Sequence, residues 1–235
     1  MAHPVQTLLR QTGREILFAL SLMIVSASIT AASAQSAVQT VVFIRHGEKP
    51  DGGFGQLSCQ GLNRALALAP IIANAFGRPD AIFVPNPSHA KMDAGTPYDY
   101  VRPLATIEPT AVFFGLPVDV SLDLYDKGGL VAALEKRRAR DHDVFILVAW
   151  EHKQIAPMVR ALLSSYSADA AVIKQVEDWD RADFDSMYVV AITQLKDGTQ
   201  ATFEHKREGL DGQSNTCPLQ RSKEGVLRMR PIIPY

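Results

Sequence analysis

The stretch Val41-Val42-Phe43-Ile44-Arg45-His46-Gly47-Glu48 joins four apolar residues to an arginine, a histidine, a glycine and a glutamate. A short apolar run of this kind is typical of a strand that is buried on both faces of a parallel sheet. Polar residues that follow such a strand lie at its carboxyl end, where open α/β sheets bind their ligands. The stretch therefore predicts a buried strand with a candidate site at its end.

The residue types at this strand end suit phosphoryl transfer. A neutral imidazole such as that of His46 can attack phosphorus. The guanidinium of Arg45 can hold two phosphate oxygens through parallel charged hydrogen bonds. Gly47 has no side chain, and we expect it to let the backbone approach the anion closely.

The segment from Arg45 to Glu48 resembles the signature of the histidine phosphatase superfamily, which has the phosphoglycerate mutase-like fold. Residues 57–65 resemble the first helix of that family, with Ser58 as a polar cap, and the apolar face of this helix is expected to comprise Ala65, Leu66, Leu68, Ala69 and Ile72. Residues 100–106 are similar to the segment in which the second phosphate-binding arginine of the family precedes a helix. The resemblance covers roughly residues 40 to 210.

A second apolar run, Val144–Ala149, ends in Trp150-Glu151-His152. The run reads as a central parallel strand, so His46 and His152 are expected to face one crevice. His152 matches the second active-site histidine of the family, and residues 179–192 resemble its late strand. The resemblance implies an α/β fold: a three-layer α/β/α sandwich with a mostly parallel central sheet.

The resemblance also implies a role for each matching side chain. His46 is the nucleophile that accepts the phosphoryl group, and Arg45, Arg102 and His152 bind the phosphate oxygens. Arg102 has an alternative role in a surface salt bridge at a helix start. Glu48 is expected to support the site by hydrogen bonding to an arginine or to the histidine ring.

The proton donor to the leaving oxygen does not follow the family pattern. Residue 153 is a lysine, so the family's acidic residue after the second histidine is absent. The loop after residues 118–120 offers Asp123 and Asp126 as alternatives to a glutamate. Our preferred donor is Glu151, because burial against Trp150 would raise the pKa of its carboxyl. The alternative is that Glu151 points away and orients His152 or binds Arg45, since strand neighbours face opposite sides.

The first 34 residues have the pattern of a secretory signal peptide. Arg10 and Arg14 precede a mainly apolar run, residues 16–29, and Ala32-Ser33-Ala34 is a typical cleavage site. We expect cleavage, which leaves residues 35–235 as one domain in the periplasm or outside the cell. The alternative is an uncleaved membrane anchor.

The remaining sequence limits the classes of partner and cofactor. A formal net charge of −1 gives no indication of a nucleic-acid surface. No metal-ligand spacing is recognisable, so we predict a metal-independent enzyme without a cofactor. Cys59 and Cys217 either form a disulfide in an oxidising compartment or stay as separate thiols. The sequence leaves open the oligomeric state and the role of residues 212–230.

These observations predict an exported phosphatase that hydrolyses small phosphomonoesters through a phosphohistidine on His46. Loops over residues 85–100 and 121–129 are expected to ring the crevice. One alternative is a phosphohistidine or polyphosphate hydrolase, since a good leaving group lessens the need for an acid. The other is a catalytically silent phosphate-binding or interaction protein of the same fold.

Overall fold

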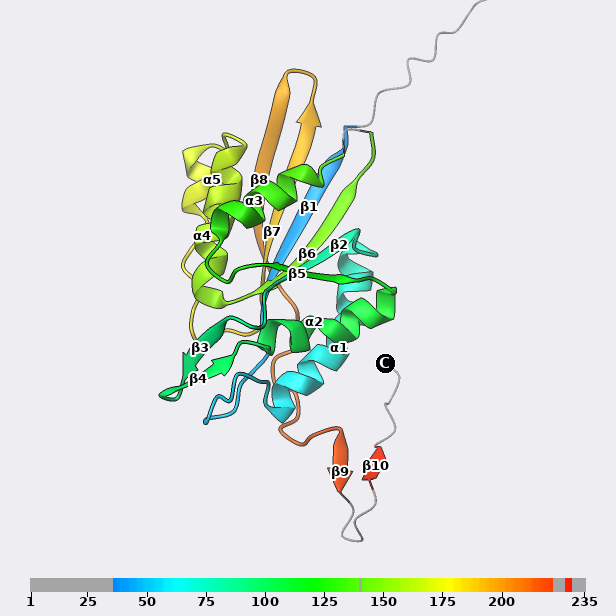
Figure 1. The fold of residues 1–235 in the computed structure, drawn as a ribbon. Coiled ribbons are helices and arrows are strands. Elements are labelled where there is room, and N and C mark those ends of the chain that lie inside the picture. Colours follow the sequence, from blue (N-terminus) through cyan, green and yellow to red (C-terminus); the bar gives the residue numbers. More distant parts are fainter. Residues whose placement is uncertain (1–35, 140, 222–226, 230–235) are drawn as a thin grey trace, which may run out of the picture. The chain divides into compact units, whose positions relative to one another are not determined.

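The computed structural model describes residues 36–139, 141–221 and 227–229, and the segment assigned to a signal peptide lies outside them. In chain order the elements are β1 (Val38–Arg45), α1 (Cys59–Phe76), β2 (Ala81–Pro85), β3 (Ala90–Asp93), β4 (Thr96–Asp99), α2 (Arg102–Phe114), β5 (Val118–Leu122), α3 (Lys127–Lys136), β6 (Val144–Trp150), α4 (His152–Ser165), α5 (Ala170–Lys174), β7 (Ser186–Leu195), β8 (Gly198–Arg207), β9 (Leu219–Arg221) and β10 (Leu227–Met229) (Figure 1).

A six-stranded mixed sheet with the order β5-β2-β6-β1-β7-β8 forms the centre of the fold. Strands β5, β2, β6 and β1 are parallel, whereas β7 is antiparallel to β1 and β8 to β7. In the register of β1 and β6, Arg45 pairs with Trp150. The two histidines that follow these strands therefore leave the sheet side by side.

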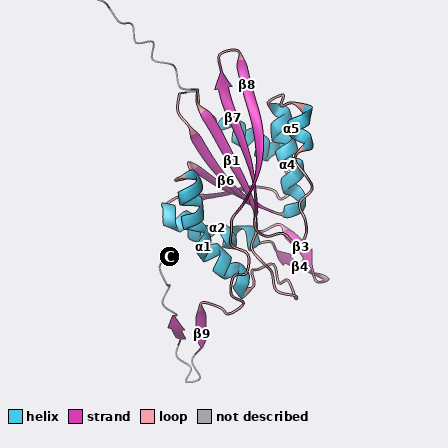
Figure 2. Cartoon of the chain, turned by 180° about the vertical axis from the view of Figure 1, so that it is seen from behind, coloured by secondary structure: helices cyan, strands magenta, loops and turns pink. Residues whose placement is uncertain are grey.

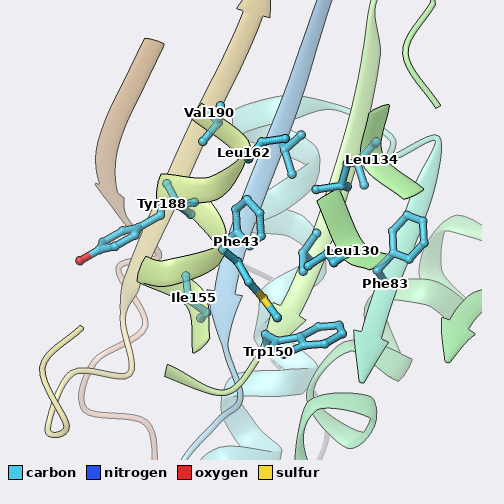
Figure 3. Packing of buried hydrophobic residues seen from close by; sticks show 14 of the residues in the cluster. Phe43, Phe83, Leu130, Leu134, Trp150, Ile155, Leu162, Tyr188 and Val190 are labelled. Carbon is cyan, nitrogen blue, oxygen red and sulfur yellow. The ribbon is translucent and has the colours of Figure 1, made fainter. Parts of the chain in front are cut away.

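Helices cover both faces of the sheet (Figure 2). Alternate residues of β1 belong to different cores: Val41 and Phe43 pack under α3 and α4, whereas Val42 and Ile44 pack under α1 and α2. Figure 3 shows the first of these cores, including Phe43 and Trp150. Each such buried side chain stabilises the fold by about 1.5–3 kcal/mol. The predicted three-layer α/β/α architecture is confirmed.

The first helix follows the prediction with one exception. Ser58 caps α1, because its hydroxyl accepts a hydrogen bond from the Gly61 amide. Ala65, Leu68, Ala69 and Ile72 are buried, but Leu66, which the pattern also places on the apolar face, is 46% exposed. Leu66 lies two residues before Leu68, roughly 200° around the helix, and so faces away from the sheet.

A disulfide, a small hairpin and a loop complete the fold. Cys59, the first residue of α1, forms a disulfide with Cys217, which decides between the two alternatives for these residues. Residues 85–100 form the β3–β4 hairpin, whose strands pair only with each other. The late strand begins at Ser186 rather than at residue 179, so residues 179–185 form a loop. No helix among the described residues is long and apolar enough to cross a membrane.

Candidate functional site

A pocket of about 480 Å³ opens at the carboxyl ends of β1 and β6. It brings together the five polar residues to which the sequence assigned catalysis or phosphate binding: Arg45, His46, Arg102, Glu151 and His152. The other two assigned residues, Gly47 and Glu48, do not line it. The first five come from three separate segments, and the parallel pairing of β1 with β6 accounts for the juxtaposition of the two histidines.

His46 is held as a neutral ring with a defined tautomer. Its Nδ1 lies 2.7 Å from the carbonyl oxygen of Gly47. A carbonyl only accepts hydrogen bonds, so Nδ1 carries the proton and Nε2 keeps its lone pair. The side chain is buried, and this burial, followed by the charge of Arg45, lowers the pKa of His46 well below 6.5. The nucleophilic form of the imidazole is therefore the stable one.

Arg45 is fixed from behind by the loop before β7. Its Nη1 donates to the carbonyl oxygens of Arg181, at 2.7 Å, and Asp183, at 2.8 Å. The guanidinium carbon lies 3.6 Å from the centre of the Phe184 ring. Burial lowers the pKa of Arg45 to about 10, and its Nε has no hydrogen-bond partner among the described residues. The sequence analysis missed this loop, which orients the arginine toward the pocket.

Arg102 is the first residue of α2 and is buried, so the surface alternative for it is wrong. It forms an ion pair with Asp93, the last residue of β3. Lys49 binds the same carboxylate, with Nζ 2.6 Å from Oδ1. Burial alone would raise the pKa of Asp93, but the hydrogen bonds from Lys49 and Arg102 outweigh it and lower this pKa. Asp93 therefore stays an anion, and the sequence analysis did not identify it.

Glu151 faces the pocket rather than away from it. It lies one residue past the end of β6, where it caps α4 by accepting a hydrogen bond from the Lys153 amide at 3.0 Å. Its Oε1 lies 3.0 Å from Nζ of Lys91, on the hairpin, and 3.3 Å from Nδ1 of His152. Since the strand has ended, the alternation of strand neighbours no longer applies to Glu151.

His152 opens α4 beside Glu151. Burial, with a further contribution from the charge of Arg45, lowers the pKa of His152 to about 4. Its Nδ1 has no partner with hydrogen-bond geometry among the described residues, despite the short distance to Glu151. His152 therefore offers a neutral ring with an unpaired nitrogen.

The two alternative proton donors lie outside the pocket. Asp123 pairs with His89, with Oδ2 2.8 Å from Nδ1, and Asp126 caps α3. No residue of the loop 121–129 lines the pocket, so the prediction that this loop rings the crevice is wrong. Instead, the carbonyl of Leu124 accepts a hydrogen bond from Nε1 of Trp150 and ties the loop to the sheet.

Gly47 differs from its predicted contact. Its amide donates to Oγ1 of Thr106 at 2.8 Å rather than pointing toward an anion. A Cβ at position 47 would lie 3.0 Å from Cα and O of Gly61. Residue 47 is therefore a glycine because β1 and α1 approach closely there, and a larger residue would push them apart.

Glu48 lies behind the pocket and binds an arginine that the sequence analysis did not consider. Its Oε1 is 2.8 Å from Nη2 of Arg64. The same guanidinium pairs with Asp185, at 3.1 Å, and with Glu208, at 2.7 Å. We call Arg64, Glu48, Asp185 and Glu208 the Arg64 cluster. Among the described residues, no group of three or more histidine, cysteine or acidic side chains could hold a metal ion.

No protein-family model and no curated protein matches this chain. Solved structures that are similar to it include the following three. Phosphoglycerate mutase from Plasmodium falciparum is 10% identical, with a TM-score of 0.45, and the match covers 74% of this chain and 92% of that one. A proposed SixA phosphohistidine phosphatase from Nakamurella multipartitia is 16% identical, with a TM-score of 0.49 and coverages of 73% and 98%. Its proposed counterpart from Agrobacterium tumefaciens is 12% identical, with a TM-score of 0.43 and coverages of 66% and 91%. These likenesses concern the fold alone.

Proposed function

We propose that this chain is a phosphatase that hydrolyses small phosphomonoesters through a phosphohistidine on His46. The observation that carries the proposal is the hydrogen bond between Nδ1 of His46 and the Gly47 carbonyl. It leaves Nε2 unprotonated in a buried ring that shares a pocket with Arg45 and Arg102. An oriented neutral imidazole between two guanidinium groups suits attack on phosphorus.

The reaction would run in two displacements. In the first, a bond forms between Nε2 of His46 and phosphorus while the bond from phosphorus to the ester oxygen breaks. In the second, a water oxygen attacks phosphorus, the N–P bond breaks and inorganic phosphate leaves. Arg45, Arg102 and His152 would bind the three equatorial oxygens, whose charge spreads in the transition state.

Glu151 remains the proposed proton donor. The other carboxylate of the pocket, Asp93, is held as an anion by Lys49 and Arg102. Nζ of Lys91 lies 3.0 Å from Oε1 of Glu151, close enough for a proton to pass between the two groups. In the first step this pair would give the proton to the departing ester oxygen, and in the second it would take one from the attacking water.

A second candidate function is hydrolysis of a phosphohistidine or a polyphosphate. The ion pair of Glu151 with Lys91 favours it, because a carboxylate bound to an ammonium is a weaker acid catalyst than a free carboxylic acid. A substrate with a good leaving group needs little protonation of the departing atom.

We also propose that the chain is exported. The pattern of residues 1–34 supports this proposal. The disulfide between Cys59 and Cys217 agrees with an oxidising compartment.

Hydrolysis of para-nitrophenyl phosphate tests the chemistry. The purified protein is compared with His46→Ala and Glu151→Gln from acidic to neutral pH in the presence of a chelator. We expect activity that survives chelation and falls about 10³-fold or more in His46→Ala. The Glu151→Gln defect should deepen as the leaving group becomes poorer, since a poor leaving group depends on the acid.

The outcomes separate the candidates. Activity that persists in His46→Ala overturns the proposed mechanism. A Glu151→Gln defect that is the same for all leaving groups removes Glu151 as the acid and favours the second candidate. Retained phosphate binding without any hydrolysis favours a silent phosphate-binding protein.

A further inference from the structure

The pocket carries more positive charge than one phosphoryl group requires. Six cationic side chains line it, against two carboxylates, an excess of four charges. The two histidines add no charge, because burial lowers the pKa of both rings. A phosphomonoester brings at most two negative charges, so about half of the excess stays unmatched when one is bound.

The cations form two tiers. Arg45 and Arg102 are buried beside His46 and would hold the phosphoryl group that is transferred. The outer tier consists of Lys49, Lys91, Lys153 and Arg181, which are half-buried or exposed at the rim. Lys49 is neutralised by Asp93 and Lys91 shares Glu151, whereas Lys153 and Arg181 form no ion pair within the described part of the chain.

Lys153 occupies an electrostatically unfavourable position. It lies in the first turn of α4, where the helix dipole disfavours a cation, and the acidic residue at this helix end, the N-cap Glu151, pairs with Lys91 instead. Lys91 is near enough for the charge of Lys153 to contribute to its lowered pKa, after burial and the charge of Arg102. Both lysines line the pocket, where Lys91 pairs with Glu151 and Lys153 has no carboxylate partner in the described part of the chain.

The pocket is also larger than one phosphate. A volume of about 480 Å³ lies within the range of about 300–1,000 Å³ that is usual for pockets that hold a whole small molecule. The outer lysines line the same cavity as His46, so one ligand can contact both tiers.

We propose that Lys91 and Lys153 form a subsite for a second phosphate group of the substrate. This inference rests on the proposed phosphatase function and specifies its substrate class: small molecules that carry two phosphate groups. The first phosphate reacts at His46, while the second is held at the rim by charge-assisted hydrogen bonds from the two lysines.

Calorimetric titration with a matched pair of ligands that cannot be hydrolysed tests the subsite without turnover. The probes are propylphosphonate and propane-1,3-diphosphonate, which differ by one phosphonate group. We expect the full protein to bind the diphosphonate at least about tenfold more tightly. Lys153→Met should lower this ratio about tenfold, whereas Lys153→Arg, which keeps the charge, should retain it.

Lys196→Met is the control variant. Lys196 lies between β7 and β8, at the opposite end of the sheet from the pocket, and should leave the ratio unchanged (Figure 1). Equal affinities for the two probes would overturn the subsite, as would a preference that survives in Lys153→Met.

Hydrolysis of para-nitrophenyl phosphate by the same preparations separates this inference from the proposed function. A preference for the diphosphonate that depends on Lys153, in a protein without hydrolytic activity, would support the proposed subsite and contradict the proposed phosphatase function. Hydrolysis without tighter binding of the diphosphonate would support the proposed phosphatase function and contradict the proposed subsite.

Discussion

The pocket around His46 and the Arg64 cluster use the same residue types in opposite proportions. In the pocket, six cations face two carboxylates. In the Arg64 cluster, one buried arginine contacts the carboxyl groups of Glu48, Asp185 and Glu208, and it also reaches the exposed carboxyl group of Asp211. The two regions lie on either side of the segment 46–48, which contributes His46 to one and Glu48 to the other.

Hydrogen bonding separates the two regions further. Four of the buried side-chain atoms without a partner among the described residues belong to pocket residues: Nε of Arg45, Nε of Arg102, Nδ1 of His152 and the Tyr100 hydroxyl. None belongs to the Arg64 cluster. Buried polar groups are normally satisfied, so the unpaired atoms agree with the ligand-binding role proposed for the pocket, and the paired ones with a structural role for the Arg64 cluster.

The largest expected effect is on activity, at Arg45. Arg45→Met should lower kcat/KM about 10³-fold, because a charged donor to the transferred phosphoryl group is lost. The free energy of unfolding should change by no more than about 1 kcal/mol, because the lost hydrogen bonds are offset by relief of a buried charge. Steady-state kinetics and urea denaturation of the same sample measure both quantities. A loss of stability without a loss of activity would show that Arg45 serves the fold rather than the pocket, contrary to the comparison with the Arg64 cluster.

The same substitution at Arg64 should act on stability. Arg64→Met removes the guanidinium that pairs with Glu48 and Glu208, while Asp185 keeps Arg207 as a partner, and the loss should cost about 3–5 kcal/mol. Urea denaturation measures the change, with Arg78→Met, at an exposed arginine two residues after the end of α1, as the control. A cost below about 1 kcal/mol would show that the cluster does not hold the fold.

Removal of the disulfide tests whether stability can be lowered without a loss of activity, and it changes no charge. Replacing both Cys59 and Cys217 by serine should lower the free energy of unfolding by about 2–4 kcal/mol. Activity per folded molecule should be retained, because neither residue lines the pocket. Thermal unfolding with and without a reductant checks the first expectation, and kinetics at low temperature check the second.

The last expected effect is a pH dependence of the free energy of unfolding that arises from Glu208. Burial, opposed in part by Arg64, raises the pKa of Glu208 from 4.5 to about 8. Between these values the unfolded chain releases a proton that the folded chain keeps, so the free energy of unfolding falls as the pH rises through this window. Glu208→Gln should flatten this part of the profile. Urea denaturation at several pH values measures it, and an equal slope in both proteins would contradict the assignment.

The sequence predicted the parts of the fold that depend on apolar periodicity. The runs Val41–Ile44 and Val144–Ala149 became the neighbouring strands β1 and β6, and this pairing placed His46 beside His152. A strand that is apolar on both faces lies in the interior of the sheet. A polar residue at its carboxyl end lies at the edge where α/β sheets bind their ligands.

The missed residues are charged or polar residues whose partners are distant in sequence. Lys91 and Asp93 belong to a hairpin that pairs only with itself, so no strand pattern connects it to the pocket. Arg64 meets Glu208 from 144 residues away. Such residues have the pattern of solvent-exposed ones, because only tertiary packing decides which are buried.

The β3–β4 hairpin lines the pocket but is separate from the central sheet. It supplies Lys91 and Asp93 to the pocket, yet it forms no ladder with the central sheet and contributes none of its core strands. His46 and His152 instead depend on strands that cannot change without loss of the core. Substitutions in the hairpin would therefore alter which molecules enter while the reacting groups stay in place, so that substrate choice and chemistry can evolve at different rates.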